Sequence, residues 1–345
     1  MLDTHNDEKV VQTLASDSKY YFQQSPKFEG ANIIDGIGFK HVTYMAEEAI
    51  LQYFKAKELG IGMLYKTYGL GFEVVGSSIR IPKLVRLDDS VRIQLKPILA
   101  SDSLEQAFSI EMLVNSEVAV SSTLKVLFRR VRDVPAATDL PEALKAYVVS
   151  DIDRYPLNKS QDSLAMIASK QSNNIGSRDS SSLSREVTGV EDAIIQTIAP
   201  KEENNFAWKW HIPYFYCHYS KWMQHSGYLR LIEEVVDLFL KARGISIWSM
   251  LESHAWIPFV SQAEVELWQD AFMEETIYTV YTVEKVVKDF LYTSRVDFYV
   301  VRGDKPIQTA RGRITHGYAR LSDNPEVFEL ARFDQKVLNA LHGRK

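Results

Sequence analysis

One histidine beside a polar, glycine-containing loop has the surroundings that best suit acid–base chemistry in this chain. His218 follows an aromatic, strand-like run that ends at Cys217. An imidazole among apolar neighbours suits general-base work better than packing. The next residues, Tyr219–Gly227, lead into a long apolar segment with helical spacing. Because the first amides of a helix lack internal acceptors, this loop predicts N–H groups that are available to a ligand.

The same loop supplies polar side chains that also have structural explanations. Gln224 and His225 could direct hydrogen-bond donors at a ligand, or they could cap the following helix. Tyr228 begins the apolar segment and fits a core position better than a catalytic one. Cys217 is the only cysteine, which excludes internal disulfides, and its apolar strand is typical of a small buried hydrophobe.

A second glycine-containing turn, residues 35–44, precedes another helical pattern. Asp35 and His41 could take up a proton there, although turn formation and packing against the helix explain them equally well. Glu48 belongs to the polar stripe of the helix expected at 45–59. The two halves of the chain thus offer two candidate sites of the same kind.

Composition bounds the class of protein. The 345 residues carry a formal charge of −5, with 46% hydrophobic residues and a pI near 6.0, which argues against nucleic-acid or anionic-membrane partners. The N-terminus lacks the apolar region of a signal peptide, and no run of eighteen apolar residues exists, so we expect a cytoplasmic protein. We expect no cofactor, because phosphate-loop, dinucleotide and serine-elbow motifs are all absent. No metal is expected either: His211, His254 and His316 lack partners at ligand spacing.

The order of expected elements occurs twice. Offsets between the copies drift from 181 (His41 to Trp222) through 186 (Val91 to Ile277) to 188 (Val126 to Ile314). Expected strands are 20–34, 68–84, 90–99, 104–114, 118–131, 206–217, 245–267, 274–286, 290–301 and 307–321, and a second helix is expected from Tyr228 to Lys241. This pattern predicts an α+β protein with two antiparallel sheets and two buried helices.

The pattern also predicts where the chain divides. We expect an N-terminal arm (1–18), a first domain (19–132), a linker (133–205), a second domain (206–322) and a C-terminal tail (323–345). Within the linker, short helical pieces are expected at 140–149 and 189–198, around an exposed serine-rich loop at 169–186.

Residues 223–234, MQHSGYLRLIEE, resemble the Val-Asn-Asn-x-x-Tyr-Leu-x-x-x-Glu-Glu motif of hotdog-fold thioesterases of the 4-hydroxybenzoyl-CoA type. IPKLVRLDDSVRIQLKP, from residue 81, resembles the strand crossing of the same family, which usually reads Pro-x-x-x-Gly-Asp-x-Val. The resemblance implies a tandem double hotdog, in which each half wraps a curved antiparallel sheet around one long helix. It also implies an acyl-CoA or acyl carrier protein thioester as substrate, with the pantetheine arm between the halves.

The resemblance also assigns roles by position. In the first half Asp35 falls on the first family aspartate and His41 on the family histidine. In the second half His218 falls on the second family aspartate. Glu48 would face a shared active site in some relatives. These four are the candidate catalytic residues. Residues at or beside the two family asparagines, where the helix begins, are the candidate substrate-binding residues: Thr43, Tyr44, Gln224, His225, Gly227 and Tyr228.

Thioester hydrolysis is the leading reaction that the resemblance implies, in polyketide or fatty-acid-like biosynthesis. A dehydratase or cyclase acting on a carrier-bound β-hydroxyacyl thioester is the alternative, although the His-x-x-x-Gly-x-x-x-x-Pro signature of dehydratases is absent. A non-catalytic acyl-binding scaffold is a second alternative. A homodimer is also possible.

Overall fold

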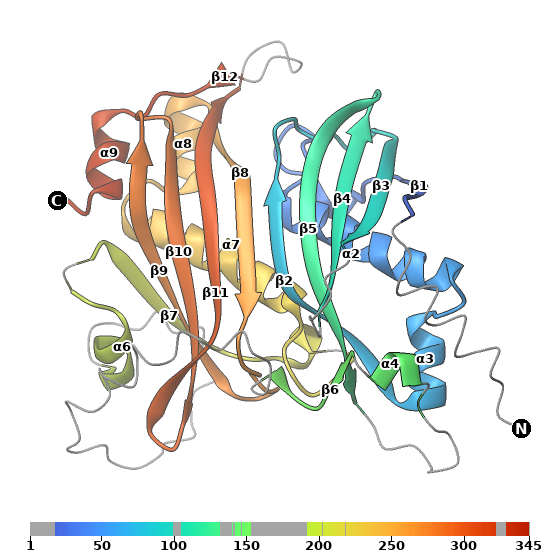
Figure 1. Cartoon of the computed structure of the whole chain (residues 1–345). Helices are drawn as coiled ribbons and strands as arrows, with labels where there is room; N and C mark the ends of the chain where they lie inside the picture. The colour runs from blue at the N-terminus through green and yellow to red at the C-terminus, as the bar shows by residue number, and fades with distance from the viewer. Residues whose placement is uncertain are drawn as a thin grey trace, which may run out of the picture.

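A computed structural model of the chain describes residues 18–98, 105–131, 140, 142–145, 147–152, 192–201, 203–217, 219–321 and 329–344 (Figure 1). The expected N-terminal arm, apart from Ser18, and the serine-rich loop at 169–186 lie outside these ranges, as does His218.

The described strands form one sheet of 12 strands rather than the two predicted sheets, because β2 of the first half pairs with β8 of the second at the centre (Figure 1). Every pairing is antiparallel except that of β5 with the short β6. The strands are β1 (Tyr20–Gln24), β2 (Leu70–Arg80), β3 (Val91–Ile98), β4 (Gln106–Val114), β5 (Glu117–Arg130), β6 (Val148–Val149), β7 (Asn205–His211), β8 (Trp256–Leu267), β9 (Thr276–Val287), β10 (Leu291–Arg302), β11 (Lys305–Arg320) and β12 (Glu329–Leu330).

The same element order occurs on both sides of the central pair. The main path runs β1-β3-β4-β5-β2 in the first half and β8-β11-β10-β9-β7 in the second. Read outward from the central pair, both halves have the same strand order. The helices are α2 (Phe39–Ala56), α3 (Ile61–Tyr68), α4 (Glu142–Lys145), α6 (Ala193–Ile198), α7 (His225–Ala242), α8 (Ile247–His254) and α9 (Gln335–Leu341), with short 3₁₀ turns η1 (Phe28–Gly30) and η3 (Tyr214–Tyr216). Both α2 and α7 have 18 residues, and their first residues are 186 positions apart (225 − 39).

The two long helices lie behind the sheet in Figure 1 and contact each other. Apolar residues at helical spacing bury one side of each helix against the strands, as Leu229, Ile232 and Val236 do in α7. Helix α7 also contacts β2 of the first half, and its first residue, His225, lies against Ser77 of that strand. This crossing brings residues from both halves to one place.

The helix boundaries differ from those predicted. Helix α2 begins at Phe39 rather than residue 45, because Phe39, Val42 and Thr43 already pack into the core. His41 is consequently the third residue of its helix, as Gly227 is of α7, so the predicted match of His41 with Trp222 is wrong.

Several predicted strands are shorter than expected, among them the strand at 20–34, where β1 ends at Gln24, two residues before Pro26. Strand β7 ends at His211, and Pro213, which lacks an N–H for the ladder, precedes the 3₁₀ turn η3. Residues 247–254 form α8 rather than a strand, because Ser246 caps it by accepting a hydrogen bond from the Ser249 amide. None of the described helices is long and apolar enough to cross a membrane.

Candidate functional site

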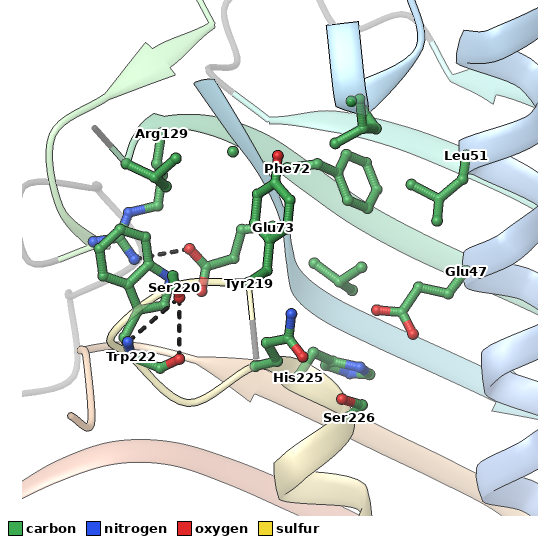
Figure 2. A pocket seen from close by; sticks show the side chains of 16 residues that line it. Glu47, Leu51, Phe72, Glu73, Arg129, Tyr219, Ser220, Trp222, His225 and Ser226 are labelled. Atoms are coloured by element: carbon green, nitrogen blue, oxygen red, sulfur yellow. Dashed lines mark hydrogen bonds and ion pairs between the residues drawn. The ribbon is translucent and has the colours of Figure 1, made fainter. Parts of the chain in front are cut away.

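A cavity of about 400 Å³ lies where the first turn of α7 meets the first half of the chain (Figure 2). Its walls come from α2, α3, β2 and β5 of the first half and from residues 219–226 before and within α7. The cavity thus exists only because the helix of one half reaches the sheet of the other.

The loop before α7 is held tightly against its surroundings. The Met223 amide donates to the Ala271 carbonyl (2.7 Å) and the Gln224 amide to the Tyr216 carbonyl (2.9 Å). At Gly227 a Cβ atom would lie 3.0 Å from Met223 Cγ, so glycine permits this close approach. The backbone of the first turn is therefore fixed in place.

Two amides at this helix start are open to a ligand. Within the described part of the chain, the backbone N–H groups of His225 and Ser226 have no acceptor, whereas the Gly227 N–H donates to the Gln224 carbonyl (2.9 Å). The helix dipole adds partial positive charge at this end. The site can thus stabilise negative charge on a carbonyl oxygen.

His225 is buried at the cavity wall, with 1% of its surface exposed. Its Nε2 lies 2.8 Å from Ser77 Oγ, and its Nδ1 has no hydrogen-bond partner among the described residues. Burial lowers the pKa of His225 to about 4, so the ring is neutral at pH 7. When Ser77 donates to Nε2, the ring proton lies on Nδ1, which is then a neutral donor for a ligand.

Glu47 extends from α2 into the cavity, on the side that Leu51 also lines (Figure 2). Burial, together with the neighbouring charge of Glu48, raises the pKa of its carboxyl to about 7. No cation pairs with Glu47 in the described residues. A carboxylate with this pKa can take up and return a proton near neutral pH.

The opposite side of the cavity holds a buried ionic cluster (Figure 2). Arg129 donates through Nη1 to Glu73 Oε2 (2.8 Å), and through Nη1 and Nη2 to the two carboxylate oxygens of Asp270 (2.7 Å each). The Trp222 ring lies 3.8 Å from the Arg129 guanidinium carbon. Burial raises the pKa of Glu73 to about 7, although Arg129 opposes this shift. Asp270 belongs to the second half, so the cluster joins the halves.

Of the residues predicted from the sequence, Gln224 and His225 line the cavity. Asp35 does not: its carboxylate pairs with Arg86 Nη1 at 2.6 Å. His41 also lies elsewhere, with Nε2 at 3.8 Å from Glu29 Oε1 and its ring against Tyr44. His218 lies outside the described residues.

The remaining predicted residues lie on the two long helices, outside the cavity lining. Thr43 donates to the Phe39 carbonyl (2.8 Å), and Tyr44 donates to the Ser226 carbonyl (3.3 Å) beside the cavity. Glu48 is exposed. Gly227 permits the tight first turn of α7, and Tyr228 is buried with its ring edge-on to Phe298.

Three residues of the cavity were not predicted from the sequence: Glu47, Glu73 and Arg129. One signal could have found Glu47: it occupies the same helix position, the ninth, as Glu233 does in α7. Glu73 and Arg129 carry no comparable signal, because the partners of Arg129 are distant in sequence: Glu73 is 56 residues away and Asp270 is 141 residues away.

The corresponding place in the other half has different chemistry. Phe39 and Lys40 are the first two residues of α2, where α7 has His225 and Ser226. Lys40 Nζ lies 2.7 Å from Glu233 Oε2. Burial raises the pKa of Glu233, and the pairing with Lys40 opposes that rise. Glu233 is therefore engaged in an ion pair with Lys40.

No family model and no curated protein matches the chain at the sequence level. Solved structures do match. The chain is 13% identical to a structure from Lactobacillus plantarum assigned as an oleoyl thioesterase, which covers 88% of this chain and 98% of that chain with a TM-score of 0.53.

Two acyl-ACP thioesterases give similar agreement. For the 12:0-ACP thioesterase of Umbellularia californica the identity is 10%, the coverage is 89% of this chain and 99% of that one, and the TM-score is 0.54. For an acyl-ACP thioesterase of Bacteroides thetaiotaomicron the values are 8%, 86%, 97% and 0.50. At such low sequence identity, similarity over nearly the full length of each chain is evidence for a shared fold alone. The chain has the α+β fold of the hotdog-type thioesterases.

Proposed function

We propose that the protein is an acyl thioester hydrolase whose active site is the cavity at the start of α7. The observation that carries this proposal is the convergence of an unpaired carboxyl, Glu47, with the open amides of His225 and Ser226. A thioester hydrolase needs a proton acceptor and donors for a developing oxyanion, and these residues provide both.

In this mechanism the thioester carbonyl oxygen accepts hydrogen bonds from the His225 and Ser226 amides, with neutral His225 Nδ1–H as a further donor. Ionised Glu47 removes a proton from a water molecule as that water attacks the carbonyl carbon. The C–S bond then breaks, and the proton held by Glu47 passes to the departing thiolate. A carboxylic acid and a free thiol leave the site.

The substrate class follows by analogy with the fold. The structural neighbours include acyl-ACP thioesterases, so an acyl group on coenzyme A or on an acyl carrier protein is the proposed substrate. The mirrored strand order and the equal helices support a double-hotdog architecture. A role in polyketide or fatty-acid-like biosynthesis, the cytoplasmic location and a homodimer stay predictions. Dehydration is not proposed, because these neighbours are thioesterases.

The test is release of free thiol from a panel of acyl-CoA and acyl-carrier thioesters. We expect Glu47→Gln to lower kcat/KM by about 100- to 10,000-fold, because general-base catalysis contributes about that much. Glu48→Gln is the matched control, since this exposed neighbour has the same side chain and should stay within about threefold of wild type.

Two outcomes would contradict the proposal. Equal losses in the Glu47 and Glu48 variants would remove Glu47 from the mechanism. Binding of acyl thioesters without any hydrolysis across the panel would leave an acyl-binding scaffold as the better account.

A further inference from the structure

Two buried polar atoms of the cavity have no hydrogen-bond partner among the described residues. Glu73 Oε1 and Arg129 Nε make no hydrogen bond with any described residue, although Glu73 is 6% exposed and Arg129 is 1% exposed. The Trp222 indole favours the charged form of Glu73 but does not complete a hydrogen bond to Oε1. An unsatisfied buried acceptor and donor on one wall are costly to the protein alone.

The charges around these atoms limit what can bind. Glu73 and Asp270 are two carboxyl groups that share one guanidinium, that of Arg129. A negatively charged group would add to an existing excess of acid, so an anion is disfavoured. A neutral group that both donates and accepts, such as a hydroxyl or a secondary amide, matches an open carboxylate oxygen and an open N–H.

The remaining lining of the cavity is partly apolar. Leu51, Phe72 and Val74 line apolar parts of the same space, which suit a hydrocarbon chain. Figure 2 shows Arg129 and Trp222 on one side, with Glu47 and Leu51 on the other and His225 between them. A substrate held with its carbonyl at the start of α7 can therefore reach the ionic cluster with another part of its length.

We propose that Glu73 and Arg129 form a specificity subsite for a neutral hydrogen-bonding group of the substrate, a hydroxyl or an amide. This inference rests on the proposed thioesterase function, and it adds a preference for substrates that carry such a polar group. The group can come from an oxygenated acyl chain or from the amides of the pantetheine arm. Asp270 and Trp222 hold the Arg129 guanidinium in place and lie behind the contact.

The test compares acyl-CoA thioesters of equal length that carry one hydroxyl group at successive carbons, with the unsubstituted thioester as reference. We expect wild type to favour at least one hydroxylated substrate in kcat/KM by about 10- to 100-fold, the range for a hydrogen bond to a charged group. Glu73→Met should abolish the preference, because methionine fills similar space without polar atoms. It leaves Arg129 paired with Asp270 at both carboxylate oxygens.

Asp270→Asn is the matched control: it removes a charge beside Arg129, its amide oxygen can still accept one of the two hydrogen bonds that hold the guanidinium, and it lies outside the cavity lining. It should retain the preference. A second arm presents the same acyl groups on N-acetylcysteamine, which lacks most of the pantetheine arm. If Glu73→Met weakens all CoA substrates equally and spares the truncated ones, the recognised group is a pantetheine amide, which also supports the subsite.

Two results would overturn the inference: no effect of Glu73→Met on any substrate, or loss of the preference in Asp270→Asn as large as in Glu73→Met. Thermal unfolding of both variants shows whether each folds. If wild type hydrolyses nothing, the proposed function fails separately. Calorimetric binding of non-hydrolysable thioether analogues, with and without the hydroxyl, then still tests the subsite.

Discussion

The starts of the two long helices have the same position in a repeated scaffold, yet among the described residues only one of them faces a carboxyl group that has no ion-pair partner. Helices α2 and α7 are equal in length, and each carries a glutamate as its ninth residue, Glu47 and Glu233. Each glutamate lies near the first turn of the other helix, since Glu47 shares a cavity with Ser226 and Glu233 contacts Lys40. The scaffold thus provides two equivalent places, and side chains decide their chemistry.

The second residue of each helix makes the difference. Lys40 pairs with Glu233, so that carboxylate has a counter-ion, which opposes the rise that burial causes in its pKa. Ser226 offers no charge to Glu47, whose pKa rises to about 7. One partly exposed ion pair thus distinguishes the two glutamates within the same scaffold. Exchanging residues between the starts of the two helices tests whether these side chains cause the difference.

Transfer of the lysine should have the largest effect. Ser226→Lys places an ammonium opposite Glu47, as Lys40 is placed opposite Glu233. The pairing should lower the pKa of Glu47 and occupy its oxygens, so thioester kcat/KM should fall by about 100- to 10,000-fold. Ser226→Met adds similar bulk without charge and should lose less. Equal losses in the two variants would assign the effect to bulk alone.

Transfer of the first residue should have a smaller effect. His225→Phe installs the residue that begins α2 and removes the Nδ1 donor, while the backbone amides remain. We expect kcat/KM to fall by about 100-fold, in the range for one lost oxyanion donor. Ser77→Ala, which removes only the partner of Nε2, should cost less activity. Unchanged activity in the phenylalanine variant would exclude His225 from the site.

The smallest expected difference between the two glutamates is in the free energy of unfolding of their glutamine variants. The folded-state pKa of Glu47, about 7, lies above the ordinary glutamate pKa of 4.5, so the folded protein binds the proton more tightly than the unfolded chain does. The stabilisation is present below pH 4.5 and is lost as pH rises through 7. Glu47→Gln should therefore raise the free energy of unfolding at pH 8 by about 1–3 kcal/mol, with little gain at pH 4.

Glu233→Gln should show no such gain, because it breaks the ion pair with Lys40. Denaturant unfolding of both variants at the two pH values measures the difference. A gain at pH 8 in the Glu233 variant that equals the gain in the Glu47 variant would show that Lys40 does not compensate its partner.

The sequence predicted the repeated element order and the approximate strands, because alternation and turn residues are local signals. It placed Gln224 and His225 where the cavity lies, since a polar loop before an apolar helix is also local. It missed Glu47 in favour of Glu48: adjacent residues on a helix point about 100° apart. Which of the two faces inward depends on contact with α7, far away in the chain.

The ionic cluster could not be predicted for a related reason. Arg129 and Asp270 are 141 residues apart, and only the pairing of the halves joins them. The start of α2 was misplaced because Gly36 and Gly38 suggested a longer turn, whereas burial of Phe39 and Val42 extends the helix.

The most direct test of the central claim is the ratio of thioester kcat/KM in Glu47→Gln to that in Glu233→Gln, measured on the same substrate and at the same pH. The two changes are chemically identical and occupy equivalent helix positions. We predict a loss of about 100-fold or more at Glu47 and a change within about threefold at Glu233. Equal losses, or a larger loss at Glu233, would contradict the assignment of the active carboxylate to Glu47.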